Sequence, residues 1–167
     1  MERKTRVILF DDDQDIRQFL ERFLKHKGYE VFIYQDPSLC PLQHSHGCQC
    51  EENERCADIV ITDIDMPNVS GLDFIDDQVR KGCKIQNIAI MSGGWSELNI
   101  KHAKDLGCAV FEKPFTLSAL TEWLDKCEER TDQGKDLSNW FLQEECNHSS
   151  FAEQSPGGDS PKAALHG

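Results

Sequence analysis

Short hydrophobic runs alternate with longer segments in which hydrophobic residues recur at helical spacing. The runs predict five strands, at residues 6–10, 30–34, 58–62, 87–91 and 109–112. Helical spacing is found in segments that include Ile16 to Leu24, Leu72 to Val79, Leu98 to Leu106 and Leu117 to Cys127. Strands that alternate with helices indicate a parallel sheet covered on both faces. The pattern therefore predicts an α/β fold with a doubly wound, five-stranded parallel sheet.

One connection departs from this pattern. Between the second and third predicted strands, residues 36–57 lack helical periodicity and contain two prolines. Proline removes a backbone donor and disrupts a helix interior. We therefore expect a Cys/His-rich loop at residues 38–57 to replace or shorten the second crossover helix.

The composition changes near residue 130. The preceding residues are long enough for one domain, so we assign residues 1–130 to a single folded unit. Residues 131–167 are polar and rich in Ser, Gly and Asp towards their end, which favours a largely disordered tail. Within it, the hydrophobic residues at 137–143 predict a short turn that docks on the domain.

Charge and hydropathy restrict the class of partner and the location. The net charge is −12 and the sequence pI is about 4.8, which argues against a nucleic-acid partner because phosphate binding needs a basic face. No stretch reaches the roughly 20 apolar residues of a membrane helix. The charged start, residues 1–6, does not resemble a secretory signal. We expect a cytoplasmic protein that does not bind membranes, with its eight cysteines mostly reduced.

Polar residues follow four of the predicted strands at the point where each strand ends. They are the triplet Asp11-Asp12-Asp13, then Asp63, Ser92 and Lys113. The carboxyl ends of parallel strands share one edge of the sheet, and ligands bind there. We expect these side chains to form one pocket, with a composition suited to a divalent cation and a phosphoryl group.

These segments together resemble the receiver domain of two-component response regulators. The resemblance covers roughly residues 5–128 and predicts a CheY-like, flavodoxin-like strand order of 2-1-3-4-5. It rests on four motifs in order: Ile8-Leu9-Phe10-Asp11-Asp12-Asp13, Ile61-Thr62-Asp63-Ile64-Asp65-Met66-Pro67 with Gly71 after it, Met91-Ser92-Gly93-Gly94, and Phe111-Glu112-Lys113-Pro114-Phe115.

The resemblance implies a role for each residue of the predicted site. Asp63 would accept a phosphoryl group from a sensor histidine kinase or a phosphotransfer protein. Mg²⁺ would be held by Asp11, Asp12, Asp63 and the backbone carbonyl of Asp65. Lys113 and Ser92 would contact the phosphoryl oxygens, and Asp13 would serve the following helix instead. The chain would then be a switch that acts on a downstream protein, with no enzymatic activity beyond its own phosphorylation and autodephosphorylation.

The loop at 38–57 contains a second set of candidate ligands: Cys40, His44, His46, Cys48, Cys50 and Cys56. Thiolates and imidazoles are the usual ligands of structural zinc. Bound zinc would order a loop that buries little apolar surface. A flexible loop of free thiols and a redox-responsive disulfide are the two alternatives. These alternatives leave room for a second function, a non-phosphorylated receiver-like adaptor whose insert binds zinc or senses redox state.

Overall fold

The computed structural model describes residues 3–142 and contains a central parallel sheet. Its strands and helices are β1 (Arg6–Phe10), α1 (Gln14–His26), β2 (Glu30–Tyr34), the 3₁₀ turn η1 (Pro37–Leu39), α2 (Pro41–His44), β3 (Glu54–Arg55), β4 (Ile59–Asp63), α3 (Gly71–Arg80), β5 (Asn87–Ser92), α4 (Glu97–Asp105), β6 (Ala109–Glu112), α5 (Leu117–Arg130) and β7 (Asp136–Leu137).

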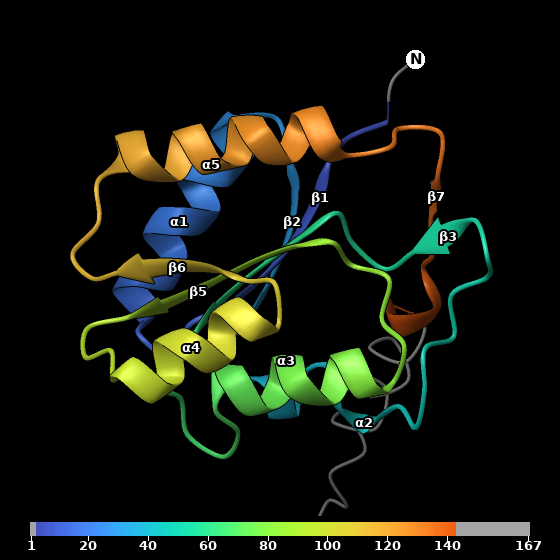
Figure 1. The fold of residues 1–167 in the computed structure, drawn as a ribbon. Helices are drawn as coiled ribbons and strands as arrows, with labels where there is room; N and C mark the ends of the chain where they lie inside the picture. Colours follow the sequence, from blue (N-terminus) through green and yellow to red (C-terminus); the bar gives the residue numbers. More distant parts are fainter. Residues whose placement is uncertain (1–2, 143–167) are drawn as a thin grey trace, which may run out of the picture.

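The strand order of the five-stranded sheet is β2-β1-β4-β5-β6, with every neighbouring pair parallel. This order confirms the predicted fold class, because β4, β5 and β6 are the third, fourth and fifth strands of the predicted sheet. Figure 1 shows α1 and α5 over one face of the sheet, and α3 and α4 over the other. The carboxyl ends of β1, β4, β5 and β6 therefore lie along one edge.

Burial on both faces explains why the strands have uninterrupted hydrophobic sequences. Along β1, Ile8 and Phe10 belong to the core under α3 and α4, whereas Val7 and Leu9 belong to the core under α1 and α5. All four residues are fully buried. Successive side chains of a strand point to opposite faces, so a strand covered on both sides needs a hydrophobic residue at every position.

Each long helix begins at a side chain that accepts a backbone N–H. Asp13 accepts from the N–H groups of Asp15 and Ile16 at 2.9 and 3.1 Å, so it caps α1 as expected. Ser70, Ser96 and Thr116 cap α3, α4 and α5 in the same way. These caps fix where each helix starts, and therefore the length of each loop at the carboxyl edge of the sheet.

The second crossover differs from the others, as predicted. A regular helix is replaced by η1, the four-residue helix α2 and an irregular segment that ends in the two-residue strand β3. Leu42 of α2 is buried, and its carbonyl accepts hydrogen bonds from Gln78 and Lys81 at 3.0 and 3.2 Å. This segment is therefore held to the end of α3 by polar contacts and by the packing of Leu42 in the same hydrophobic core as Phe74 and Ile75 of that helix.

Packed structure continues beyond residue 130. β7 pairs in parallel with β3, and the two lie side by side in Figure 1. Phe141 follows; it is fully buried and packs edge-on against Phe32, with ring centroids 5.7 Å apart. Arg6 ties this segment to β1, because its guanidinium donates to the carbonyl of Ser138 at 3.0 Å. The remainder of the predicted tail, 143–167, lies outside the described residues, as does residue 143 of the predicted docking turn.

Among the described residues, the helices are too short or too polar to cross a bilayer.

Candidate functional site

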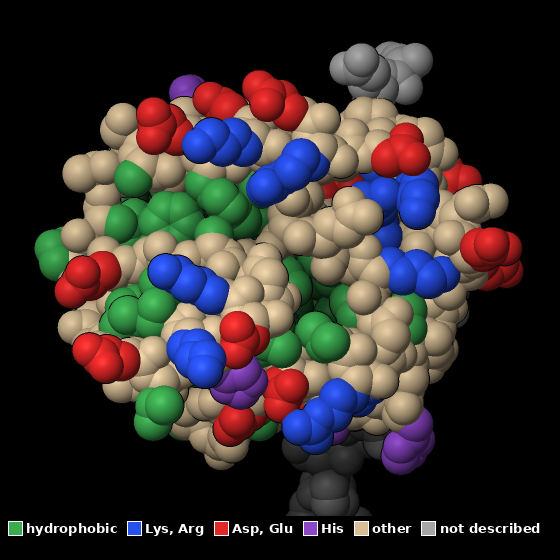
Figure 2. Space-filling model, in the orientation of Figure 1, with side chains coloured by type: hydrophobic (Ala, Val, Ile, Leu, Met, Phe, Trp, Pro, Cys, Tyr) green, Lys and Arg blue, Asp and Glu red, His purple; other side chains and the backbone are tan. Residues whose placement is uncertain are grey.

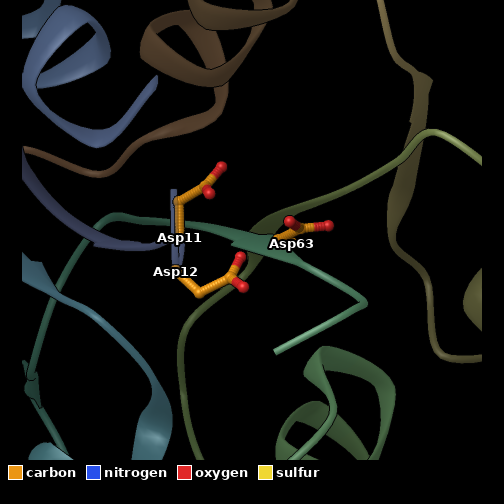
Figure 3. Close-up of side chains that lie close together, drawn as sticks. All are labelled: Asp11, Asp12 and Asp63. Atoms are coloured by element: carbon orange, nitrogen blue, oxygen red, sulfur yellow. The ribbon is translucent and has the colours of Figure 1, made fainter. Parts of the chain in front are cut away.

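Three carboxylates meet at the carboxyl edge of the sheet. Asp11 and Asp12 follow β1, and Asp63 is the last residue of β4. One oxygen of each lies within 4.8 Å of the others (Figure 3). Asp11 is fully buried and Asp63 is 7% exposed, whereas Asp12 is exposed. The predicted pocket is therefore open to solvent on the side of Asp12.

Lys113 joins this acidic group from the loop after β6. Its Nζ lies 3.1 Å from an oxygen of Asp11 and 3.1 Å from an oxygen of Asp63. Burial raises the pKa of both carboxyl groups, and the Lys113 ammonium opposes that rise without cancelling it. Burial alone would lower the pKa of Lys113, but Asp11 and Asp63 outweigh it and raise that pKa. The single ammonium of Lys113 is therefore shared between the carboxylates of Asp11 and Asp63, and it does not fully neutralise their charge.

Ser92 is the last residue of β5 and lies near the acidic group, but its hydroxyl contacts Asp65. Its hydroxyl is 3.4 Å from an oxygen of the Asp65 side chain and accepts from the N–H of Gly94 at 3.1 Å. The backbone N–H of Asp65 in turn donates to Asp63 at 3.4 Å. Ser92 is thus linked to Asp63 through Asp65.

The backbone that carries Asp63 is fixed by Gly71. The N–H of Gly71 donates to the carbonyl of Ile64 at 3.0 Å. A Cβ atom added at Gly71 would lie 2.0 Å from the carbonyl oxygen of Asp63, far inside any permitted contact. Glycine is therefore needed here because α3 begins directly against the backbone of the nucleophile candidate.

Sequence reasoning missed two groups that position the acids. Arg17, on the first turns of α1, donates from Nη1 to the backbone carbonyl of Asp11 at 2.7 Å. The Thr62 hydroxyl donates to the carbonyl of Asp63 at 2.9 Å. A basic residue one helical turn beyond the Asp13 cap was the only signal for Arg17, and a buried strand residue gives none for Thr62.

The donor set fits a small hard cation. Mg²⁺ takes oxygen ligands, binds through one or two carboxylates and keeps several waters. The acidic group offers carboxylate oxygens from Asp11, Asp12 and Asp63, with the solvent-open side at Asp12 available for water. A divalent cation would also offset the charge that Lys113 leaves uncompensated. The structure therefore contains a suitable Mg²⁺ site.

The six predicted zinc ligands do not converge on one point. Within residues 3–142, the acidic group is the one set of three or more His, Cys, Asp or Glu side chains whose ligand atoms all lie within 4.8 Å. Cys40 is buried in the core, and Nε2 of His44 lies 2.7 Å from the carbonyl of Ser38. Of the six candidates, Cys50 and Cys56 have sulfur atoms 3.1 Å apart. Tetrahedral zinc needs four ligands around one point, so these contacts do not support a zinc site formed by Cys40, His44, His46, Cys48, Cys50 and Cys56.

The chain is similar in sequence to known regulatory proteins. A family model described as the response regulator receiver domain matches residues 7–125. A probable transcriptional regulatory protein of Picosynechococcus is 30% identical over 118 residues, which is 70% of this chain and 46% of that protein. The C4-dicarboxylate transport transcriptional regulatory protein DctD of Pseudomonas aeruginosa is 26% identical over 119 residues, 71% of this chain and 24% of that protein.

A sensor protein also matches. The CAI-1 autoinducer sensor kinase/phosphatase CqsS of Vibrio cholerae is 38% identical over 70 residues, 42% of this chain and 9% of that protein. The chain thus spans less than half the length of each of these three relatives.

Solved structures share the fold. The chemotaxis protein CheY4 of Vibrio cholerae superposes with a TM-score of 0.59 at 24% identity, over 75% of this chain and 99% of that one. The non-phosphorylated HemR receiver domain of Leptospira biflexa superposes with a TM-score of 0.64 at 22% identity, over 77% of this chain and 98% of that one.

Proposed function

Because this chain belongs to the response regulator receiver family, we propose that Asp63 accepts a phosphoryl group in a Mg²⁺-dependent reaction and that its phosphorylation switches a protein-binding surface. Receiver domains act as phosphoacceptor switches and bind Mg²⁺ at an acidic cluster. The observation that carries the proposal is the contact of the Asp63 carboxylate with Lys113, beside the carboxylates of Asp11 and Asp12.

The phosphoryl donor is a phosphohistidine, on a sensor histidine kinase or a phosphotransfer protein. An oxygen of Asp63 forms a bond to phosphorus while the phosphorus–nitrogen bond of the donor breaks, and the leaving imidazole takes up a proton. Little covalent chemistry is required of the protein, so catalysis depends on position and on charge. The similarity to a sensor kinase supports a partner of this class.

Lys113 and Ser92 act on the oxygens of the transferred group. Lys113 already lies 3.1 Å from Asp63, so its ammonium can pair with a phosphoryl oxygen without a large movement. The Ser92 hydroxyl leaves Asp65 and donates to a second oxygen. Asp11, Asp12, Asp63 and the carbonyl of Asp65 would hold Mg²⁺, which would supply charge neutralisation. Hydrolysis of the acyl phosphate by water at the open side of the site returns Asp63 to its free state.

The output of the switch is a protein contact. Rotation of Ser92 pulls on the segment that leads from β5 to α4, and such a change shifts the population of two existing arrangements. Figure 2 shows hydrophobic side chains gathered between α5 and α4, over β6, and Leu98 of α4 is 80% exposed. We assign the downstream target to this face and the protein to the cytoplasm. The net charge of −12 supports a protein target over a nucleic acid.

A small phosphodonor tests the proposal directly. We expect incubation with acetyl phosphate and Mg²⁺ to add one phosphoryl group to the intact protein, and a chelator to prevent it. Asp63→Asn should remove the label. Asp13→Asn is the matched control, because asparagine also caps a helix and Asp13 lies outside the acidic group.

Two outcomes would contradict the proposal. Labelling that persists in Asp63→Asn would place the phosphoryl group elsewhere. No labelling of the wild type, under conditions that label a control receiver domain, would favour an adaptor that is never phosphorylated.

A further inference from the structure

The thiols of Cys50 and Cys56 approach one another at the opposite end of the sheet from the acidic group. Their sulfur atoms are 3.1 Å apart, against about 2.0 Å in a disulfide. Both cysteines are reduced in the structure. Cys56 precedes β4 and Asp63 ends it, so the pair lies on the order of 20 Å from Asp63 at about 3.3 Å per strand residue. A disulfide would bring the two sulfur atoms about 1 Å closer, far from Asp63.

We propose that Cys50 and Cys56 are a redox-active dithiol, which a low-molecular-weight disulfide such as oxidised glutathione converts to an intramolecular disulfide.

The two cysteines are placed differently, and this difference assigns their roles. Cys50 is half-buried, on the loop before β3, whereas Cys56 is 2% exposed. Cys56 is fixed by the protein interior, because its carbonyl accepts from the buried Arg6 at 3.2 Å and its sulfur accepts from Nε1 of Trp140 at 3.1 Å. An external disulfide can therefore reach Cys50, while Cys56 is positioned to attack Cys50 afterwards.

The surroundings of Cys50 favour its thiolate. The pKa of Cys50 is lowered to about 6; the hydrogen bond with the Cys56 thiol is the largest cause, and burial opposes it. Trp140, Cys48 and the Lys84 ammonium add to this lowering. The same contact, together with burial, raises the pKa of Cys56. A thiolate beside a protonated thiol is the arrangement that thiol–disulfide exchange requires.

The exchange takes place in two balanced steps. The Cys50 thiolate attacks one sulfur of the small disulfide, forms a mixed disulfide and releases a small thiolate, which takes up a proton. Cys56 then loses its proton and attacks the Cys50 sulfur, which releases a second small thiolate. The dithiol loses two electrons, and the small disulfide is reduced to two thiols.

A metal site at these thiols is the competing interpretation. Cys48 and Cys83 lie close enough to affect the pKa values of the pair. Within residues 3–142, however, Cys50 and Cys56 do not belong to any group of three or more ligand atoms that all lie within 4.8 Å of one another. Two close sulfurs and no closed set of four favour a disulfide over tetrahedral zinc.

Counting free thiols tests the proposal on the full chain. The reduced protein is equilibrated with mixtures of oxidised and reduced glutathione, quenched with acid, unfolded in denaturant, alkylated with a maleimide and weighed intact. The sequence has eight cysteines, so we expect eight adducts before oxidation and two fewer after it. Peptide mapping should locate the link between Cys50 and Cys56, and dithiothreitol should restore all adducts.

Substitutions separate the roles of the thiols. Cys50→Ser should abolish the oxidation, and since Cys50 is half-buried on a loop this variant should fold; labelling of Asp63 with acetyl phosphate verifies that it does. Cys56→Ser should stop the reaction at a glutathione adduct on Cys50. Cys83→Ser is the matched control, a half-buried neighbouring thiol whose loss should leave the disulfide intact.

Three results would overturn the proposal. One is that Cys50 and Cys56 stay alkylatable at glutathione ratios that oxidise a control dithiol. Another is that the disulfide joins a different pair, such as Cys48 and Cys83. The third is that the purified, untagged protein holds one zinc per chain and oxidises only after chelation, which would assign these thiols to a metal.

Discussion

The strongest stability prediction concerns Phe141, which lies outside the segment that matches the receiver family. Its side chain is fully buried, 5.7 Å from the ring of Phe32 and 5.8 Å from the guanidinium of Arg6. It occupies the core on the face where the short α2 replaces a crossover helix. We therefore expect Phe141→Ala to destabilise the whole domain.

The magnitude follows from the area that the ring buries. An aromatic side chain buries roughly 150–250 Å². At about 25 cal/mol per Å² this area contributes about 4–6 kcal/mol. A compact denatured state lowers that value by roughly 10–40%. The result, about 2–5 kcal/mol, overlaps the usual cost of a buried Phe→Ala substitution. It is a large fraction of the roughly 5–15 kcal/mol that stabilises a domain.

Urea denaturation measures this loss. With a slope of about 2 kcal/mol per M, the midpoint should fall by roughly 2 M. Phe19→Ala is the control, because the same ring on α1 is 55% exposed and its removal should cost less than about 1 kcal/mol. If Phe141→Ala costs no more than Phe19→Ala, the packing of residues 136–142 on the domain is wrong.

Three further predictions concern the site. Gly71→Ala should lower the free energy of unfolding, measured in urea, by about 1–3 kcal/mol and sharply slow the labelling of Asp63, because the new Cβ collides with the Asp63 carbonyl. Gly47→Ala is the control, because Gly47 has open space around it, and it should change neither quantity. In the absence of Mg²⁺, Asp63→Asn should raise the urea midpoint at neutral pH. In the folded protein the pKa of Asp63 is raised above its ordinary value of 3.8, so ionisation of this carboxyl lowers the free energy of unfolding as pH rises through the folded pKa. The stability gained by Asp63→Asn should therefore vanish as pH falls towards 3.8. An unchanged midpoint at neutral pH would contradict this. Mg²⁺ at about 100 times its Kd should stabilise the wild type by about 2.7 kcal/mol, and Asp12→Asn should require a higher Mg²⁺ concentration for the same gain; equal stabilisation of both at every concentration would exclude Asp12 as a ligand.

The site was predictable because it depends on local pattern and one rule of topology. Hydrophobic runs locate the strands, and parallel strands must share an edge at their carboxyl ends. That edge brings Asp11, Asp63 and Lys113 within hydrogen-bonding distance, although about 100 residues separate the first from the last. The contact of Ser92 with Asp65 was not predictable, because a short hydrogen-bonding side chain at a strand end gives no sign of its partner in the sequence.

The sequence by itself determined the strands, the acidic group and the replacement of the second crossover helix, and its resemblance to receiver domains predicted the strand order. Only the tertiary structure decided what fills the space beside that crossover. Cys40 is buried in the core, and His44 hydrogen-bonds a nearby carbonyl. The thiols of Cys50 and Cys56 lie in contact, and Phe141 packs into the core from the far end of the described chain. In a helix or strand, the spacing of hydrophobic residues shows which side packs against the core, whereas an irregular loop has no such spacing. Its contacts are set by whichever distant side chains the sheet brings within reach.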